Sequence, residues 1–233
     1  MGKKIISNYQ AKYYNKGDYS AIHPYIDRKI GIIKRYFSNF NNLSILDIGC
    51  YTGEVTAELK LLGAKAIGCD ISLISLQKAK EKNVEVVQVD VSDNIPFKDN
   101  SFDLVYCSEV IEHLMDTDKF LIEIKRTLKT EGLLFLTTPN IVALKNRFRL
   151  LFGKYPFNLE YKMGGAGHVH LYNKEKLNEQ LKENGFNVIK FYGINIIPWS
   201  LCTKSKIIYR FNSLISNQLS SLCLNMAVIS MKE

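Results

Sequence analysis

The chain has 233 residues, of which 46% are apolar and 23% charged. This is enough to bury a full core, and we expect one domain over 1–233. No stretch reaches the roughly 18 uncharged apolar residues of a spanning helix, the start has no export or lipidation signal, and the five cysteines form no Cys-x-x-Cys pair. We therefore expect a soluble cytoplasmic protein with reduced thiols. The net charge of +8 does not choose between nucleic acid, an anionic membrane surface and a phosphorylated substrate.

The first 42 residues stand outside the pattern of the rest of the chain and form a predicted cap segment, 1–42. A helix is expected from about 25 to 37, and four tyrosines precede it: Tyr9, Tyr13, Tyr14 and Tyr19. Such a segment either caps a pocket or packs on the sheet, and the sequence leaves both readings open.

The heptapeptide from Asp47 to Gly53 leaves an apolar strand and is typical of a nucleoside-cofactor loop. Gly49 and Gly53 let the backbone approach a ligand closely, and the next helix offers its unpaired N–H groups there. A dinucleotide-binding loop would have glycine in place of Asp47. A carboxylate there repels a pyrophosphate but suits the ammonium and sulfonium of S-adenosylmethionine (SAM). The loop, which includes Cys50 and Tyr51, therefore predicts SAM rather than NAD.

Short runs rich in valine and isoleucine then alternate with helical periods, the pattern of a parallel sheet covered on both faces. Strands are predicted at 43–48, 65–70, 84–90, 102–108 and 132–138, and helices at 53–62, 72–82 and 116–130. Asp116 is the expected N-cap of the third helix, and Gly132 its stop.

The order changes after Pro139, where an insertion at 141–172 is expected to lie above the sheet as a lid. It begins with a basic helix, and the chain continues with a helix at 174–184, strand-like segments at 187–194 and 224–230, and an amphipathic run at 205–218. The prediction is an α/β, Rossmann-like fold. Its doubly wound seven-stranded sheet is mostly parallel, with an antiparallel C-terminal edge hairpin.

Polar residues end the first four strands, where an open parallel sheet binds its ligand. Asp70, about 20 residues past the loop, can accept both ribose hydroxyls, or else cap a helix. Asp90 can meet the adenine amino group while Val91 meets the ring face, or else it closes a turn. Ile71 and Ser108 complete the predicted cofactor-binding set.

Two acids and an imidazole follow the fourth strand at i, i+3 and i+4: Glu109, Glu112 and His113. On one helical turn these three side chains share a face. Methyl transfer requires alignment of donor and acceptor and removal of the acceptor's proton. The cluster suggests a divalent metal, and the alternatives are His113 as a direct general base and a structural role.

Together these motifs resemble class I SAM-dependent methyltransferases, over roughly residues 40–195. The resemblance rests on 47–53, Asp70, 89–105 and 107–114, and it is strongest to the branch containing the ubiquinone-biosynthesis O-methyltransferases. It implies that Arg28, in a segment similar to that branch's N-terminal part, helps to hold the cofactor's carboxylate. It also implies that Tyr51 stands at a glycine position, so that its side chain must fit beside the cofactor.

By the same resemblance, the Glu-x-x-Glu-His motif of 109–113 binds a divalent ion (Mg, Mn or Zn) with a further histidine from the insertion. His168 falls where that histidine is expected, whereas alternation points His170 away from it. Related methyltransferases carry the motif without a metal, so the alternatives for His113 stay open.

The expected function is O-methylation of a small-molecule or lipid-like acceptor bound under the insertion. The insertion is apolar through Phe148, Leu150, Leu151, Phe152, Tyr155 and Phe157, and basic through Lys145, Arg147, Arg149 and Lys154. It is therefore either a peripheral contact with an anionic membrane or a lid packed on its own domain. The alternative functions are an RNA 2′-O-methyltransferase, although no RNA-binding module is recognised, and a SAM-binding regulatory protein without catalysis.

Overall fold

The computed structural model describes residues 25–157, 167–197, 202 and 205–233. Tyr9, Tyr13, Tyr14 and Tyr19 of the predicted cap segment and the centre of the insertion lie outside the described residues. All five cysteines are buried free thiols.

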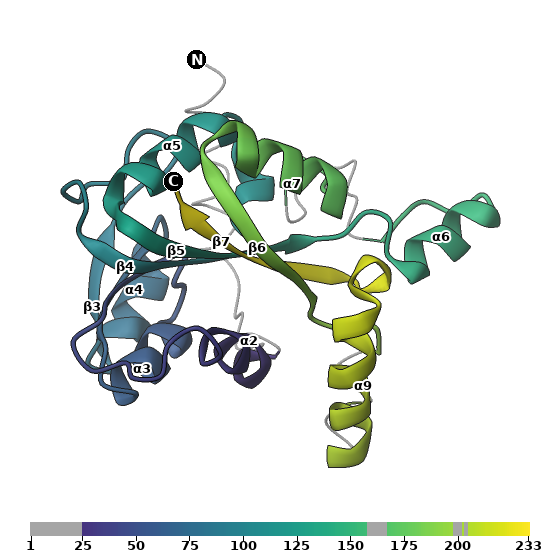
Figure 1. Cartoon of the computed structure of the whole chain (residues 1–233), viewed down its shortest axis with the longest axis horizontal. Coiled ribbons are helices and arrows are strands. Elements are labelled where there is room, and N and C mark those ends of the chain that lie inside the picture. The colour runs from purple at the N-terminus through teal and green to yellow at the C-terminus, as the bar shows by residue number, and fades with distance from the viewer. Residues whose placement is uncertain (1–24, 158–166, 198–201, 203–204) are drawn as a thin grey trace.

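A seven-stranded sheet in the order β3-β2-β1-β4-β5-β7-β6 forms the centre of the molecule (Figure 1). Its strands are β1 Ser44–Ile48, β2 Lys65–Asp70, β3 Glu85–Gln88, β4 Phe102–Ser108, β5 Leu128–Pro139, β6 Phe186–Gly193 and β7 Asn225–Lys232. Strands β1 to β5 pair in parallel, and β7 runs antiparallel to both β5 and β6. The predicted Rossmann-like sheet and its antiparallel C-terminal hairpin are confirmed.

Helices cover both faces of this sheet, which confirms the doubly wound prediction. They are α2 Ile26–Ile33, α3 Glu54–Leu61, α4 Leu73–Lys80, α5 Thr117–Thr127, α6 Leu144–Leu151, α7 Lys174–Glu183 and α9 Lys206–Gln218, with short 3₁₀ turns η1 Ile111–His113 and η2 Ser220–Leu222. Figure 1 shows α5 and α7 on one face of the sheet and α2 and α3 on the other. Their buried side chains belong to two separate core clusters. None of the described helices has the length and apolar content needed to span a bilayer.

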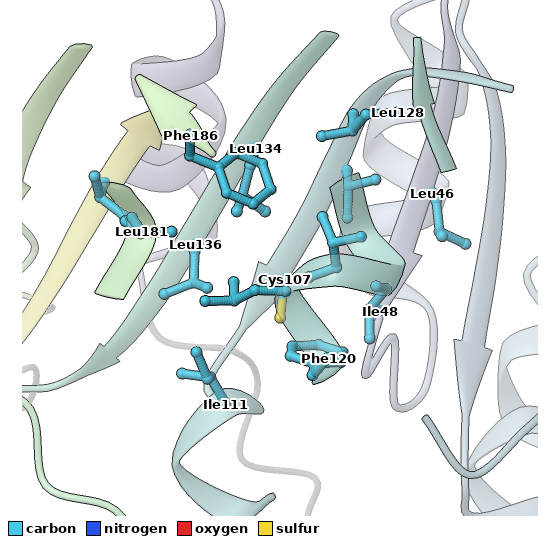
Figure 2. Close-up of a cluster of buried hydrophobic side chains, with 14 of the residues drawn as sticks. Leu46, Ile48, Cys107, Ile111, Phe120, Leu128, Leu134, Leu136, Leu181 and Phe186 are labelled. Atoms are coloured by element: carbon cyan, nitrogen blue, oxygen red, sulfur yellow. The ribbon is translucent and has the colours of Figure 1, made fainter. Parts of the chain in front are cut away.

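The core has two layers because successive residues of a strand face opposite sides. Ile45 of β1 packs toward α2 and α3, whereas Leu46 packs on the other side. Figure 2 shows this second layer, where Leu46 and Cys107 of the sheet lie with Phe120 of α5 and Leu181 of α7. Each such large apolar side chain contributes roughly 1.5–3 kcal/mol through burial.

The junction between α5 and β5 differs from the prediction. Asp116 is the N-cap as expected, and it accepts from the backbone N–H of Lys119 at 3.1 Å. The helix, however, ends at Thr127, and β5 begins at once with Leu128, which pairs with Phe102 before a register shift. Gly132 is therefore inside β5 and is no helix stop.

Candidate functional site

The carboxyl ends of β3, β2, β1 and β4 lie side by side at one edge of the sheet. These four strands are neighbours and all parallel, with Ile48 paired to both Cys69 and Cys107 and Asp70 paired to Gln88. Parallel strands end at the same edge, so the polar residues predicted for a cofactor share that edge.

The loop after β1 has the conformation that its two glycines predict. Gly49 has φ +71°, and a Cβ there would clash with Val110 Cγ2. Gly53 has φ +78°, and its Cβ would lie 2.8 Å from Ala79 Cβ. Both positions are therefore restricted to glycine by backbone angle and by close packing.

Tyr51 occupies the left-handed region with φ +50°, which explains why a glycine is expected at this position. Its backbone N–H donates to Asp70 Oδ2 at 3.0 Å, and the side chain is half-buried. The preceding N–H groups of Gly49 and Cys50 both donate to the carbonyl of Cys69, at 2.8 and 3.0 Å. These contacts fix the loop over the end of β2.

Asp70 is the last residue of β2, and both its oxygens accept backbone N–H groups. Oδ1 accepts from Ser72 at 2.8 Å, while Ser72 itself caps α4 through the N–H of Ser75. Burial raises the pKa of Asp70, and the N–H bonds oppose this shift. Each oxygen keeps a second lone pair that a ribose hydroxyl can use. Ile71 beside it is half-buried.

Asp47 lies inside β1, one residue before its end, and is only 1% exposed. Its Oδ2 accepts from Thr56 Oγ1 of α3 at 2.6 Å, and burial raises its pKa to about 7. The carboxyl is thus buried between β1 and α3, and it does not carry the plain exposed charge that the motif suggested.

Asp90 lies two residues beyond β3 and closes its own turn. Its Oδ1 accepts from the backbone N–H and the hydroxyl of Ser92, at 3.0 and 2.6 Å. Val91 packs, partly buried, against the main core cluster. The structure thus contains the turn-capping contact of the alternative reading, and the adenine contact stays a prediction.

The Glu-x-x-Glu-His segment does not form the predicted helical turn. Glu109 has φ +57°, and only Ile111–His113 form a short 3₁₀ turn, so the three side chains do not share a helical face. The carboxylate of Glu109 is held by the Thr137 hydroxyl and the Asn225 amide, each at 2.7 Å. The left-handed backbone at Glu109, directly after β4, interrupts the helical geometry on which the i, i+3 and i+4 prediction depended.

The structure instead brings together Glu112, His113 and His168, whose candidate ligand atoms all lie within 4.8 Å of one another. Two backbone hydrogen bonds hold the segment of His168 beside Glu112. The N–H groups of Val169 and His170 donate to the Glu112 carbonyl at 2.8 and 3.1 Å. The rings of His113 and His168 are 4.8 Å apart between centroids. His170, by contrast, points elsewhere, and its Nε2 lies 3.4 Å from the carbonyl oxygen of Met115.

Glu112 is 1% exposed, and its Oε2 accepts from Thr138 Oγ1 at 3.1 Å. Burial and the neighbouring Glu109 hold its pKa well above the usual range. Oε1 is buried without a hydrogen-bond partner among the described residues, and it lies 4.0 Å from His113 Nε2. One carboxylate oxygen and two imidazoles are a donor set that suits a divalent transition metal, so these residues fit such an ion.

Arg28 does not face this site. It is 6% exposed, and its guanidinium donates to the Gly193 carbonyl, to the carbonyl and hydroxyl of Ser213, and to Asn217 Oδ1. Arg28 thus ties α2 to β6 and α9, and the cofactor role implied by the resemblance does not match this position.

The next residue, Lys29, is the one that reaches the site, and the sequence reasoning missed it. Its Nζ donates to Ser108 Oγ, at the end of β4, at 2.7 Å. The available signal was helical spacing, because Lys29 falls on the apolar stripe formed by Ile26, Ile30 and Ile33.

Comparison with known proteins assigns the family. The model of the family described as "Methyltransferase domain" matches residues 22–190. The chain belongs to this methyltransferase domain family. The resemblance to class I methyltransferases is therefore confirmed at the level of the family.

Relatives and solved structures agree with this assignment. The chain is similar to an uncharacterized protein of Methanocaldococcus jannaschii (31% identity, 65% of this chain and 64% of the relative). It is also similar to the mitochondrial ubiquinone biosynthesis O-methyltransferase of Bos taurus, with 26% identity over 79% of this chain and 55% of the relative. The matches thus span less than two thirds of either relative. A SAM-dependent methyltransferase from Thermotoga maritima shares the fold of this methyltransferase domain. The TM-score is 0.67 at 18% identity, and the match covers 97% of this chain and 99% of the other.

Proposed function

We propose that the protein is a SAM-dependent O-methyltransferase acting on a small-molecule or lipid-like acceptor. The observation that carries this proposal is the shared edge at which the glycine loop, Asp70 and Ser108 meet. The names of relatives such as the bovine ubiquinone biosynthesis O-methyltransferase favour an oxygen acceptor.

Cofactor binding is assigned to the loop and to Asp70. The loop backbone is held over β2, and the Asp70 carboxylate is fixed by two N–H groups, so neither has to reorganise when a nucleoside binds. SAM, when bound, supplies a methyl group on a sulfonium. The acidic surroundings of this edge, with Asp47 and Asp70 close enough to influence one another, favour a cationic ligand.

Activation of the acceptor is assigned to the cluster of Glu112, His113 and His168. These residues would hold a divalent ion, which lowers the pKa of a bound hydroxyl. Without an ion, the His113 imidazole is the group suited to take the acceptor's proton near neutral pH. Oε1 of Glu112 is buried without a hydrogen-bond partner among the described residues, and this supports the first version.

The cofactor assignment is tested by Asp70→Asn, which keeps a carbonyl for one backbone N–H but removes the charge. We expect SAM affinity to fall about tenfold or more, because charge-assisted hydrogen bonds are roughly twice as strong as neutral ones. Asp93→Asn, an exposed acid on a nearby turn, is the matched control and should bind normally. Calorimetry measures both, and equal affinities for the parent and Asp70→Asn would refute the assignment.

The activation assignment is tested by chelation together with paired histidine variants. If an ion is held, chelator should suppress turnover and added divalent ion restore it. Direct metal titration should then show binding that His168→Ala weakens and His170→Ala does not, since only His168 belongs to the cluster. Full turnover in chelator would leave His113 as the base. A radiolabelled-methyl screen over quinone, lipid, glycan and RNA acceptors separates the substrate classes.

A further inference from the structure

Helix α9 presents large apolar side chains to solvent. Ile207, Phe211 and Leu214 are 80%, 56% and 66% exposed. Their spacing of i, i+4 and i+7 places them on one face of the helix, which we call the α9 stripe. Figure 1 shows α9 projecting away from the sheet. The stripe therefore belongs to an element that another surface can reach.

Other side chains of α9 anchor the helix to the rest of the protein. Asn212 is fully buried, and its Oδ1 accepts from the backbone N–H groups of Ile196 and Ile197, at 3.1 and 2.9 Å. Ile208 and Tyr209 pack, partly buried, against the core cluster on the α2 side of the sheet. The three residues of the stripe belong to neither core cluster. The fold thus holds α9 in place without using the stripe.

The charge around the stripe has one sign. Residues 184–232 include no aspartate or glutamate, and the exposed Arg210 flanks the stripe on α9. The part of the insertion at 141–157 also contains no acid. An apolar helical face flanked by bases is typical of a helix that lies in the interface of an anionic bilayer.

The two acid-free segments meet in the structure. Asn140, at the start of the insertion, donates through Nδ2 to the carbonyls of Ser221 and Cys223, both at 2.9 Å, directly after α9. Figure 1 shows α6 and α9 on the same side of the molecule. Because β5, which leads to Asn140, is parallel to β4, this side adjoins the edge of the sheet that carries the proposed site.

We propose that the α9 stripe docks on an anionic lipid bilayer, with its apolar side chains among the acyl chains and Arg210 at the lipid phosphates. This contact is separate from the one that the sequence predicts for the insertion. A second copy of the chain fits the stripe less well, because pairing two α9 helices would bring two basic, acid-free surfaces together. Docking through α9 places the proposed site beside the bilayer.

The apolar part of the contact is tested by Ile207→Ser with Leu214→Ser. Sedimentation with vesicles of phosphatidylcholine and phosphatidylglycerol measures the affinity, and we expect at least a tenfold loss because two large side chains no longer leave water. Leu61→Ser with Ile122→Ser is the matched control, since these side chains are 82% and 56% exposed on α3 and α5. The control should sediment like the parent.

The charge of the contact is tested by Arg210→Glu. The variant should bind anionic vesicles about fivefold more weakly or worse, because a base beside such a surface contributes about 1 kcal/mol. Its binding to vesicles of phosphatidylcholine alone should match that of the parent. Lys80→Glu, an exposed lysine of α4, changes the net charge equally and should leave both affinities unchanged.

Other outcomes overturn the proposal. A parent protein that does not sediment with anionic vesicles excludes the contact, and equal losses in the two double variants remove α9 from it. A dimer in analytical ultracentrifugation that Phe211→Ser dissociates would assign the stripe to a second copy instead. Circular dichroism of each variant shows that the fold is retained. Vesicle binding is measured without SAM, so failure of the proposed function would leave this result intact.

Discussion

At the scale of single residues, burial changes what a motif residue can do. The sequence alone predicts that Asp47 is ionised. In the structure its carboxyl is buried and accepts a hydrogen bond from Thr56 Oγ1, and burial raises its pKa to about 7. Near neutral pH the Asp47 carboxyl is therefore partly protonated, and a cationic ligand would favour its ionised form.

Asp47 makes stability depend on pH in a defined direction. Its pKa rises from 3.8 to about 7 on folding, so the folded state binds the proton more tightly. The contribution of this proton to the free energy of unfolding is fully present below about pH 4. It falls by up to about 4 kcal/mol as the pH rises through the folded pKa. Asp47→Asn removes this titration. Urea unfolding of the ligand-free proteins at pH 5 and pH 8 should show a smaller pH effect in the variant. Equal pH effects in parent and variant would contradict this explanation.

At the scale of elements, α6 exposes several large apolar side chains. Figure 1 shows it standing away from the sheet, and Leu151 and Phe152 are 74% and 70% exposed. The stretch 141–157 contains four bases and no acid. These exposed apolar and basic side chains support the contact with an anionic membrane that the sequence predicts.

Charge reversal on this segment tests the membrane contact. Lys145→Glu with Lys154→Glu should weaken sedimentation with anionic vesicles tenfold or more, since each base near such a surface contributes about 1 kcal/mol. Lys78→Glu with Lys80→Glu, two exposed lysines of α4, changes net charge equally and should bind like the parent. No binding by the parent, or equal losses in both double variants, would exclude the contact.

At the scale of the whole molecule, the last strand completes the sheet. β7 lies between β5 and β6, and Ala227, Val228 and Ile229 are fully buried. β3, in contrast, is a short edge strand whose Val86 and Val87 are half-buried. The C-terminal residues are therefore central to the fold although they are last in the chain.

Hydrogen exchange should reflect this placement. Amides of β7 should exchange only through global unfolding, because both of its edges are paired and its side chains are enclosed. Amides of β3 should exchange faster through local opening. Mass spectrometry of peptides from the two strands measures the difference, and β7 exchanging as fast as β3 would contradict it.

The sequence by itself determined most of the elements, and it predicted the edge of the sheet that we propose as the ligand site. Periods of 2 and 3.6 fix strands and helices locally, and Gly49, Gly53 and Asp70 stand where the turn geometry requires them. Only the tertiary structure decided that Lys29 faces the site while Arg28 faces away, and that Glu109 leaves the cluster that Glu112 forms with His168. The physical reason is that side-chain direction at a junction depends on backbone angles and on packing partners distant in sequence, such as Ser108 for Lys29, and local spacing carries no information about either.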